Sequence, residues 1–344
     1  MSNILEFSPY KKKENLEKKL ISSVKLGDFN KVSTYLSYDL DLNYKDSSGK
    51  TALIWATIQN YHNLIKILIK NKASIEVSDN MGKTPLIWAS ELGYFNIVKI
   101  LLNSKPIVDR RDQDSMSALS WASLNGHVEI IKLLLENGAD INLIDRDGAT
   151  PLVHASWSGS LDAVKILVEN NADINKSDYS KQTALFRATY KNFIDILDFL
   201  LSKGADYNLL DINSWSVFIW ALIQENYDSS NMLLKYGFNI NDIINNEDPI
   251  LIFFVKEENY SVIEYLIKKN INIDIRDNRG RTALMHSAEL GNFKIVKLLL
   301  KYGANPFKSD KHGNTPFLYA IENNFLKVSD LIHQEILKLR KNRK

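Results

Sequence analysis

The sequence predicts an all-α solenoid of about ten stacked units, each built from a turn, a short helix, a loop and a longer helix. The main observation is a block of the form Gly-x-Thr-Ala/Pro-Leu-x-x-Ala that returns every 33 residues, as at 49–56, 82–89 and 148–155. A second is an aspartate three residues before that block in nearly every copy. Such stacks bury a continuous core between neighbouring repeats, so they offer an extended binding surface rather than a deep catalytic cleft.

Each repeat is expected to open with a tight turn. Aspartate followed three residues later by glycine favours such a turn, because the carboxylate accepts nearby backbone N–H groups and glycine tolerates a positive φ. The leading aspartates are Asp46, Asp79, Asp112, Asp145, Asp178, Asp211, Asp277 and Asp310.

The residue pattern then predicts two helices per repeat. A threonine caps the first helix, and proline follows it at Thr84-Pro85 and Thr150-Pro151, as expected for a first helical turn. A glycine such as Gly93 separates the two helices, and the second, richer in leucine and isoleucine, ends at a glycine such as Gly138.

This order of turn, short helix, loop and longer helix, with a Thr-Pro-Leu motif and a Gly-Ala-Asp-Ile-Asn tail at 138–142, resembles the ankyrin repeat. The resemblance covers roughly residues 16–335 and includes nine blocks in register. It implies an ankyrin-repeat solenoid that binds a partner protein through its concave groove. We expect an N-terminal extension at 1–14 and one array at 15–344, with an N-terminal cap at 15–45, repeats at 46–309 and a C-terminal cap at 310–344.

Composition excludes several other classes of protein. The 43 basic and 41 acidic residues give a net charge of only +2, which argues against a nucleic-acid partner. The absence of cysteine removes disulfides, thiol catalysis and cysteine-based zinc sites. No apolar run is long enough for a membrane span and no secretory signal is visible, so we expect a cytoplasmic monomer without cofactor or metal. A secreted bacterial effector that acts on a host protein remains an alternative.

The enzymatic alternative depends on Gly-Lys-Thr at 49–51 and 82–84, which imitates the end of a phosphate-binding loop. That loop needs another glycine five residues earlier, and Tyr44 and Val77 stand there. We therefore expect no enzyme. Nucleotide hydrolysis that is abolished by Lys50→Ala or Lys83→Ala would contradict this expectation.

One position of the first helix, here called the inner column, is mostly aromatic. Its members are Trp55, Trp88, Trp121, His154, Arg187, Trp220, Phe253, His286 and Tyr319. Where the column holds His154 and Arg187 instead of a tryptophan, phenylalanine or tyrosine, Trp157 and Tyr190 follow three residues later on the same face. Two interpretations stay open: the rings line the groove and bind a partner, because large rigid rings bury much area at low entropic cost, or they pack between neighbouring repeats.

Apolar turn tips near the middle of the chain favour the first interpretation. Together with the column they define the predicted partner site, flanked by the polar side chains of Asn125, Lys191 and Gln224. The residues that we assign to partner binding are Trp55, Trp88, Trp121, Trp157, Tyr179, Tyr190, Leu210, Ile212, Trp215 and Trp220.

The repeat at 244–275 departs from the pattern. It lacks the leading aspartate, the glycine and the threonine, and it carries Phe253 and Phe254, the latter where a small residue stands in other repeats. We expect a local distortion and the weakest interface of the stack at this repeat.

Overall fold

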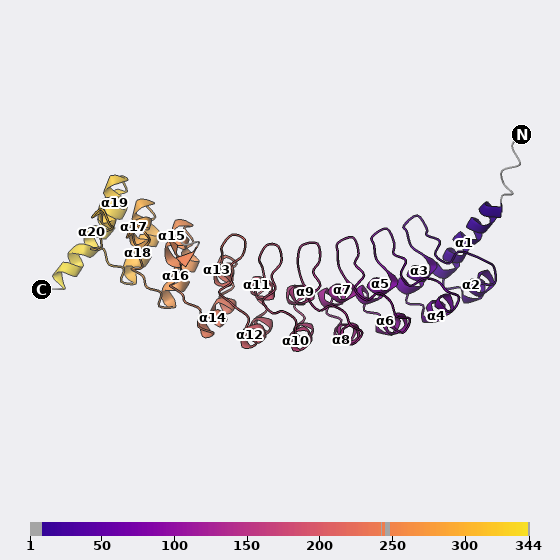
Figure 1. The fold of residues 1–344 in the computed structure, drawn as a ribbon. Helices are drawn as coiled ribbons and strands as arrows, with labels where there is room; N and C mark the ends of the chain where they lie inside the picture. Colours follow the sequence, from indigo (N-terminus) through magenta and orange to yellow (C-terminus); the bar gives the residue numbers. More distant parts are fainter. Residues whose placement is uncertain (1–8, 242, 245–247, 343–344) are drawn as a thin grey trace, which may run out of the picture. The chain divides into compact units, whose positions relative to one another are not determined.

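The computed structural model describes residues 9–241, 243–244 and 248–342. In these residues it contains twenty helices and two short strands (Figure 1). They divide into two compact units, one formed by 9–191 with 202–205 and the other by 192–201 with 206–342. Among the described residues, no helix combines the length and apolar character that crossing a bilayer requires.

The first unit consists of two rows of helices. It begins with the pair α1 (Pro9–Lys25) and α2 (Phe29–Tyr35), so the predicted N-terminal extension is helical from Pro9, and its residues 1–8 lie outside the described chain. The short first helices pack against one another in one row, and the second helices in another. The first helices are α3 (Ala52–Ile58), α5 (Pro85–Glu91), α7 (Ala118–Leu124), α9 (Pro151–Ser158) and α11 (Ala184–Tyr190). The second helices are α4 (His62–Lys70), α6 (Phe95–Leu102), α8 (Val128–Glu136) and α10 (Leu161–Glu169).

The second unit repeats this plan. Its first helices are α13 (Val217–Ile223), α15 (Ile250–Lys256), α17 (Ala283–Glu289) and α19 (Pro316–Glu322). Its second helices are α12 (Ile194–Ser202), which lies in this unit except for its last residue, α14 (Tyr227–Lys235), α16 (Tyr260–Lys268), α18 (Phe293–Lys301) and α20 (Leu326–Lys341). The last two residues of the predicted C-terminal cap, 343–344, lie outside the described chain.

Most of the first helices begin at a side-chain cap where the sequence predicts one; α11 and α15 begin without a cap hydrogen bond. The hydroxyl of Thr51 accepts the backbone N–H of Ile54, and Thr84, Ser117, Thr150, Ser216, Thr282 and Thr315 cap their helices in the same way. Proline occupies the first turn of α5, α9 and α19, as predicted.

Backbone hydrogen bonds hold neighbouring turns of the first unit together. The N–H of Gln113 donates to the carbonyl of Met81 at 2.9 Å, that of Arg146 to Asp114 at 3.0 Å, and that of Tyr179 to Asp147 at 2.9 Å. The turns that project from the first-helix row therefore lie side by side (Figure 1).

The core lies between the two rows of each unit. Leucine and isoleucine of both helices are almost fully buried, and an alanine in the middle of each first helix, such as Ala89 or Ala122, lets neighbouring helices approach closely. This packing is the nearest-neighbour interface that stabilises a repeat array.

The irregular repeat keeps the register of the others. Strands β1 (Ile243–Ile244) and β2 (Asp248–Pro249) pair Ile243 with Pro249, at the position where other turns form the single bridges Arg111–Ser117 and Leu210–Ser216. Phe254 is 2% exposed at the alanine position of α15. The backbone of α15 lies close to α17 along its length and close to α13 at far fewer points. On the α13 side, the ring of Phe253 contacts Trp215, which stands just before α13.

Candidate interaction surface

Each leading aspartate connects its turn to its first helix through both carboxylate oxygens. In the second repeat, Oδ1 of Asp79 accepts the backbone N–H groups of Met81 and Lys83, which closes the turn. Oδ2 of the same residue accepts the indole N–H of Trp88, nine residues later, at 2.9 Å. The inner column is therefore tied to the turn that precedes it.

The same bond recurs with chemically different donors. The pairs and their distances to Oδ2 are Trp55 to Asp46 at 2.8 Å, Trp121 to Asp112 at 2.8 Å, His154 to Asp145 at 2.9 Å, Arg187 to Asp178 at 2.5 Å, Trp220 to Asp211 at 2.9 Å, His286 to Asp277 at 2.9 Å and Tyr319 to Asp310 at 2.7 Å. What the column conserves is a hydrogen-bond donor rather than an aromatic ring.

The irregular repeat tests this rule within the chain itself. Its column residue, Phe253, carries no polar donor, and nine residues before it stands Ile244 instead of aspartate. Donor and acceptor are thus lost together. Because an unpaired buried carboxylate is costly, this joint loss indicates that the pair serves the framework.

Lysines cover the indole rings at the start of the first unit. Lys25 Nζ lies 4.1 Å from the ring centroid of Trp55, and Lys83 Nζ lies 4.8 Å from that of Trp88 and 3.8 Å from that of Trp121. Such cation–π contacts stabilise partly desolvated cations. The rings of Trp55, Trp88 and Trp121 are half-buried, and the chain's own side chains already occupy part of their faces.

Trp157 and Tyr190 differ from these indoles because they are exposed at the ends of α9 and α11. Their side chains are 37% and 39% accessible, and their rings stack with centroids 5.9 Å apart at an interplanar angle of 16°. Lys191 Nζ lies 4.0 Å from the centroid of Trp157. The pair forms an exposed aromatic surface with a cation beside it.

Tyr179 adds a third exposed ring at a turn tip of the same unit. It is 68% accessible, and its ring rests on Gly148, where an added Cβ would meet the ring at 2.8 Å. Gly148 also has φ +82°, so glycine is required both for the backbone and for the ring that covers it.

The remaining predicted residues lie in the second unit. Leu210 and Ile212 are 48% and 63% exposed at a turn. Trp215 is half-buried and makes edge-to-face contacts with Trp220 at 5.8 Å and with Phe253 at 6.4 Å. Trp220 itself is held by Asp211, as described above.

The predicted site thus separates into two kinds of residue. Trp55, Trp88, Trp121 and Trp220 are half-buried and bonded to leading aspartates. Trp157, Tyr179, Tyr190, Leu210 and Ile212 are the exposed members. Trp215 belongs to neither group, because it is half-buried but packs on Trp220 and Phe253. The flanking residues Asn125, Lys191 and Gln224 are exposed as well.

A cavity of about 220 Å³ lies beside the exposed ring of Trp157. It is lined by Leu124, Asp145, Asp147, Ala149, Val153, His154, Trp157 and Arg187. Burial raises the pKa of Asp145, but hydrogen bonds from His154 and from the backbone of Ala149 outweigh it and hold the pKa below its usual value. Asp145 is therefore an ionised carboxylate at neutral pH.

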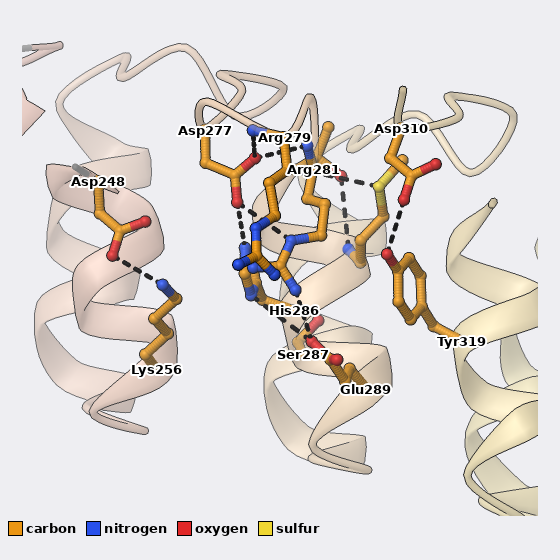
Figure 2. Close-up of polar contacts among 12 residues, drawn as sticks. Asp248, Lys256, Asp277, Arg279, Arg281, His286, Ser287, Glu289, Asp310 and Tyr319 are labelled. Carbon is orange, nitrogen blue, oxygen red and sulfur yellow. Dashed lines mark hydrogen bonds and ion pairs between the residues drawn. The ribbon is translucent and has the colours of Figure 1, made fainter. Parts of the chain in front are cut away.

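The second unit contains a buried polar network around His286 (Figure 2). Its Nε2 bonds to Asp277, and Arg281 joins the same carboxylate through Nε at 3.1 Å and Glu289 through Nη1 at 3.1 Å. Burial is the main cause that lowers the pKa of His286, so the imidazole is neutral at neutral pH. Figure 2 also shows Asp248 paired with Lys256, whose Nζ lies 2.7 Å from the carboxylate. These two residues occupy the repeat positions of Arg281 and Glu289, with the acidic and basic residues exchanged.

Sequence reasoning identified the aromatic column but missed its acceptors and the cavity. The sequence did contain a signal for the acceptors. Every column residue except Phe253 can donate a hydrogen bond, and each of these donors follows an aspartate by nine residues. The cavity had a weaker signal in Ala149, the smallest residue at its repeat position.

Comparisons with known proteins agree with the geometry. The family model for ankyrin repeats (three copies) matches residues 20–112, 104–178, 175–244 and 245–342. Among solved structures, the chain is similar to the ankyrin repeat domain of Bcl-3, described as a unique member of the IkappaB protein family. The two are 26% identical with a TM-score of 0.57, and the match covers 62% of this chain and 97% of that one. The comparison with curated proteins gives no match.

The family model spans almost all of the described residues, and the solved structure shares both fold and repeat. Ankyrin repeats are in general protein–protein interaction modules and are typically not enzymes. The chain belongs to the ankyrin-repeat family.

Proposed function

We propose that this protein is a non-enzymatic adaptor that binds another protein through the face formed by its first helices and turns. The observation that supports this most strongly is the exposed cluster of Trp157, Tyr190 and Tyr179 in the first unit. Large exposed rings with few rotatable bonds are typical of binding hot spots. The nearly balanced charge favours a protein partner over a nucleic acid. In this proposal the protein acts as a monomer.

The half-buried tryptophans contribute to this function indirectly. Their bonds to the leading aspartates fix the turns relative to the first helices, so that exposed turn residues such as Ile212, next to Asp211, keep a defined position. A rigid site loses less entropy on binding than a flexible one. Replacing Trp220 with alanine would therefore disturb the fold, and it is a poor test of binding.

The experiment is a capture of partners from cells of the source organism, repeated with Trp157→Ala and Tyr179→Ala. We expect each variant to lose at least about 2 kcal/mol of affinity for a true partner, with an unchanged circular dichroism spectrum. The matched control is Phe95→Ala, because Phe95 is a ring of similar exposure (39%) at the start of α6 in the second-helix row. Equal weakening by the control, or full retention by both test variants, would contradict the proposal.

A further inference from the structure

At one repeat position, the cavity beside Trp157 is lined by an alanine. That position, four residues after the leading aspartate and here called the filling position, lies just before the cap of the first helix. Its residues along the chain are Lys50, Lys83, Met116, Ala149, Gln182, Trp215, Asp248, Arg281 and Asn314. Ala149 is the smallest of them, and it lines the cavity together with the column residues His154 and Arg187.

In earlier repeats a lysine of the chain occupies the corresponding space. Lys83 is 3% exposed and lies between the inner-column rings of its own repeat and the next, with Nζ 2.6 Å from a carboxylate oxygen of Glu91. Lys50 lies in the same way between Trp55 and Trp88, at 5.6 and 5.5 Å from their centroids. The architecture of the repeat therefore accepts a long cationic side chain at this point.

The leading carboxylates give the same indication. Oδ2 of Asp46 accepts the indole N–H of Trp55 and also the ammonium of Lys25 at 2.9 Å. Oδ2 of Asp277 likewise bonds to both His286 and Arg281.

Asp79 shows the arrangement a third time, since its Oδ2 accepts Trp88 and has Lys50 Nζ at 3.5 Å. In the described part of the chain, Asp145 Oδ2 bonds to His154, and no lysine or arginine bonds to it. Asp145 is 9% exposed and lines the cavity.

The charges at the cavity favour a cation. Asp145 and Asp147 are both lining residues, and Asp147 is exposed. The lining cation, Arg187, is already bonded to Asp178 at 2.5 Å. Lys191 contacts Trp157 from the end of α11 and does not line the cavity.

We propose that this cavity receives one arginine or lysine side chain of a protein partner. It takes the place that the filling residue itself holds in other repeats, where Lys83 lies between two column rings and Arg281 bonds to its own leading carboxylate. The side chain lies along Trp157 and His154, and its charged end faces the carboxylates of Asp145 and Asp147. A volume of about 220 Å³ suits a single long side chain better than a drug-sized ligand, for which pockets of roughly 300–1,000 Å³ are usual. The inference rests on the proposed function, because it names the chemistry of the partner at that surface.

The test uses the full chain and two displayed libraries of short random peptides that differ only in a fixed central residue, arginine in one and glutamate in the other. We expect binders from the arginine library. Their affinity should fall at least about tenfold, or about 1.4 kcal/mol, for Ala149→Lys, which supplies the cation from within the chain as Lys83 does. Because lysine is native at this position in two other repeats, Ala149→Lys should keep the thermal stability of the wild type.

A second variant tests the charge without filling the cavity. Asp147→Asn should weaken the arginine peptides severalfold, whereas Asp114→Asn, the same turn position one repeat earlier and outside the cavity lining, should leave them unchanged. Enrichment of the glutamate library, or full binding to Ala149→Lys, overturns the cation inference.

The same experiment separates this inference from the proposed function. If peptides bind Ala149→Lys as tightly as the wild type but fail to bind Tyr179→Ala, that result refutes the cation inference alone and still supports binding at the first-helix face. The absence of any binder that depends on Trp157, Tyr179 or Ala149 refutes both.

Discussion

The two oxygens of each leading aspartate carry out different tasks. Oδ1 closes the turn through backbone N–H groups, and Oδ2 holds a donor on the first helix, as Asp112 does with Met116 N–H and Trp121. Hydrogen bonds to a charged group contribute more than those between neutral groups. One residue thus fixes the turn and also its angle to the helix that bears the inner column.

This arrangement predicts the effect of Trp88→Phe. The substitution keeps a ring of similar shape but removes the N–H that donates to Asp79, whose side chain is fully buried. We expect the free energy of unfolding to fall by about 1.5–3 kcal/mol, as measured by urea denaturation.

The matched control for this prediction is Phe253→Trp. It adds an N–H in the repeat where Ile244 replaces the aspartate, so it should bring no stabilisation. Equal stability of Trp88→Phe and the wild type would show that the indole contributes through its ring alone.

The buried imidazole of His286 predicts a pH dependence of stability. Burial lowers its pKa in the folded chain below the usual 6.5, while Asp277, Glu289 and Arg281 surround it. Below pH 6.5 the unfolded chain therefore takes up a proton that the folded chain does not, and stability is lost as the pH falls.

We expect the unfolding free energy of the second unit to fall between pH 7 and pH 5, and to fall less in His286→Gln. Glutamine can still donate a hydrogen bond to Asp277 but does not titrate. Hydrogen exchange of α17 at both pH values provides the local measurement. The same pH dependence in wild type and variant would exclude His286 as its source.

At the scale of the element, local chemistry was enough to place the helices. Threonine, proline and glycine act within one turn of chain, so helix starts such as Thr51 and positive-φ residues such as Gly138 (φ +83°) could be predicted from sequence. The start of α1 at Pro9 was not predicted, because the first repeat lacks the motif that marks the others.

The candidate site could be predicted only in part, for a physical reason. Exposure of Trp157 and burial of Trp121 depend on which side chains of the next repeat cover them, and a single-repeat pattern does not contain that information. The cavity arises from residues of three successive first helices and one turn.

Helix capping yields a prediction with an internal control. Thr51 and Thr183 are both 1% exposed and have similar extended backbones at helix starts, but Thr51 makes a cap hydrogen bond and the side chain of Thr183 makes none. Thr51→Ala should therefore cost about 1 kcal/mol more than Thr183→Ala, measured by urea unfolding of the two variants. Equal costs would mean that the lost methyl group, rather than the cap, determines the stability.

At the scale of the whole molecule, stability is a sum of interfaces between neighbouring repeats. The two compact units and the weak approach of α13 to α15 indicate that these interfaces are unequal. Disturbance of one repeat should then spread to its neighbours and fade beyond them, unlike in a globular domain that unfolds as one body.

Phe254→Ala is the sharpest test of this expectation. Phe254 is 2% exposed and packs edge-to-face on Phe253 at 5.0 Å, so its truncation leaves a cavity that should cost about 3–5 kcal/mol. In the wild type, hydrogen exchange should already be faster in α15 than in α7, because the irregular repeat lacks the aspartate bond and a side-chain cap. The variant should widen this difference by faster exchange in α13–α16, while protection of α5–α8 stays unchanged. Loss of protection across α5–α8 as well would show that the chain unfolds as a single cooperative body, and nearest-neighbour stability would then be wrong for this array.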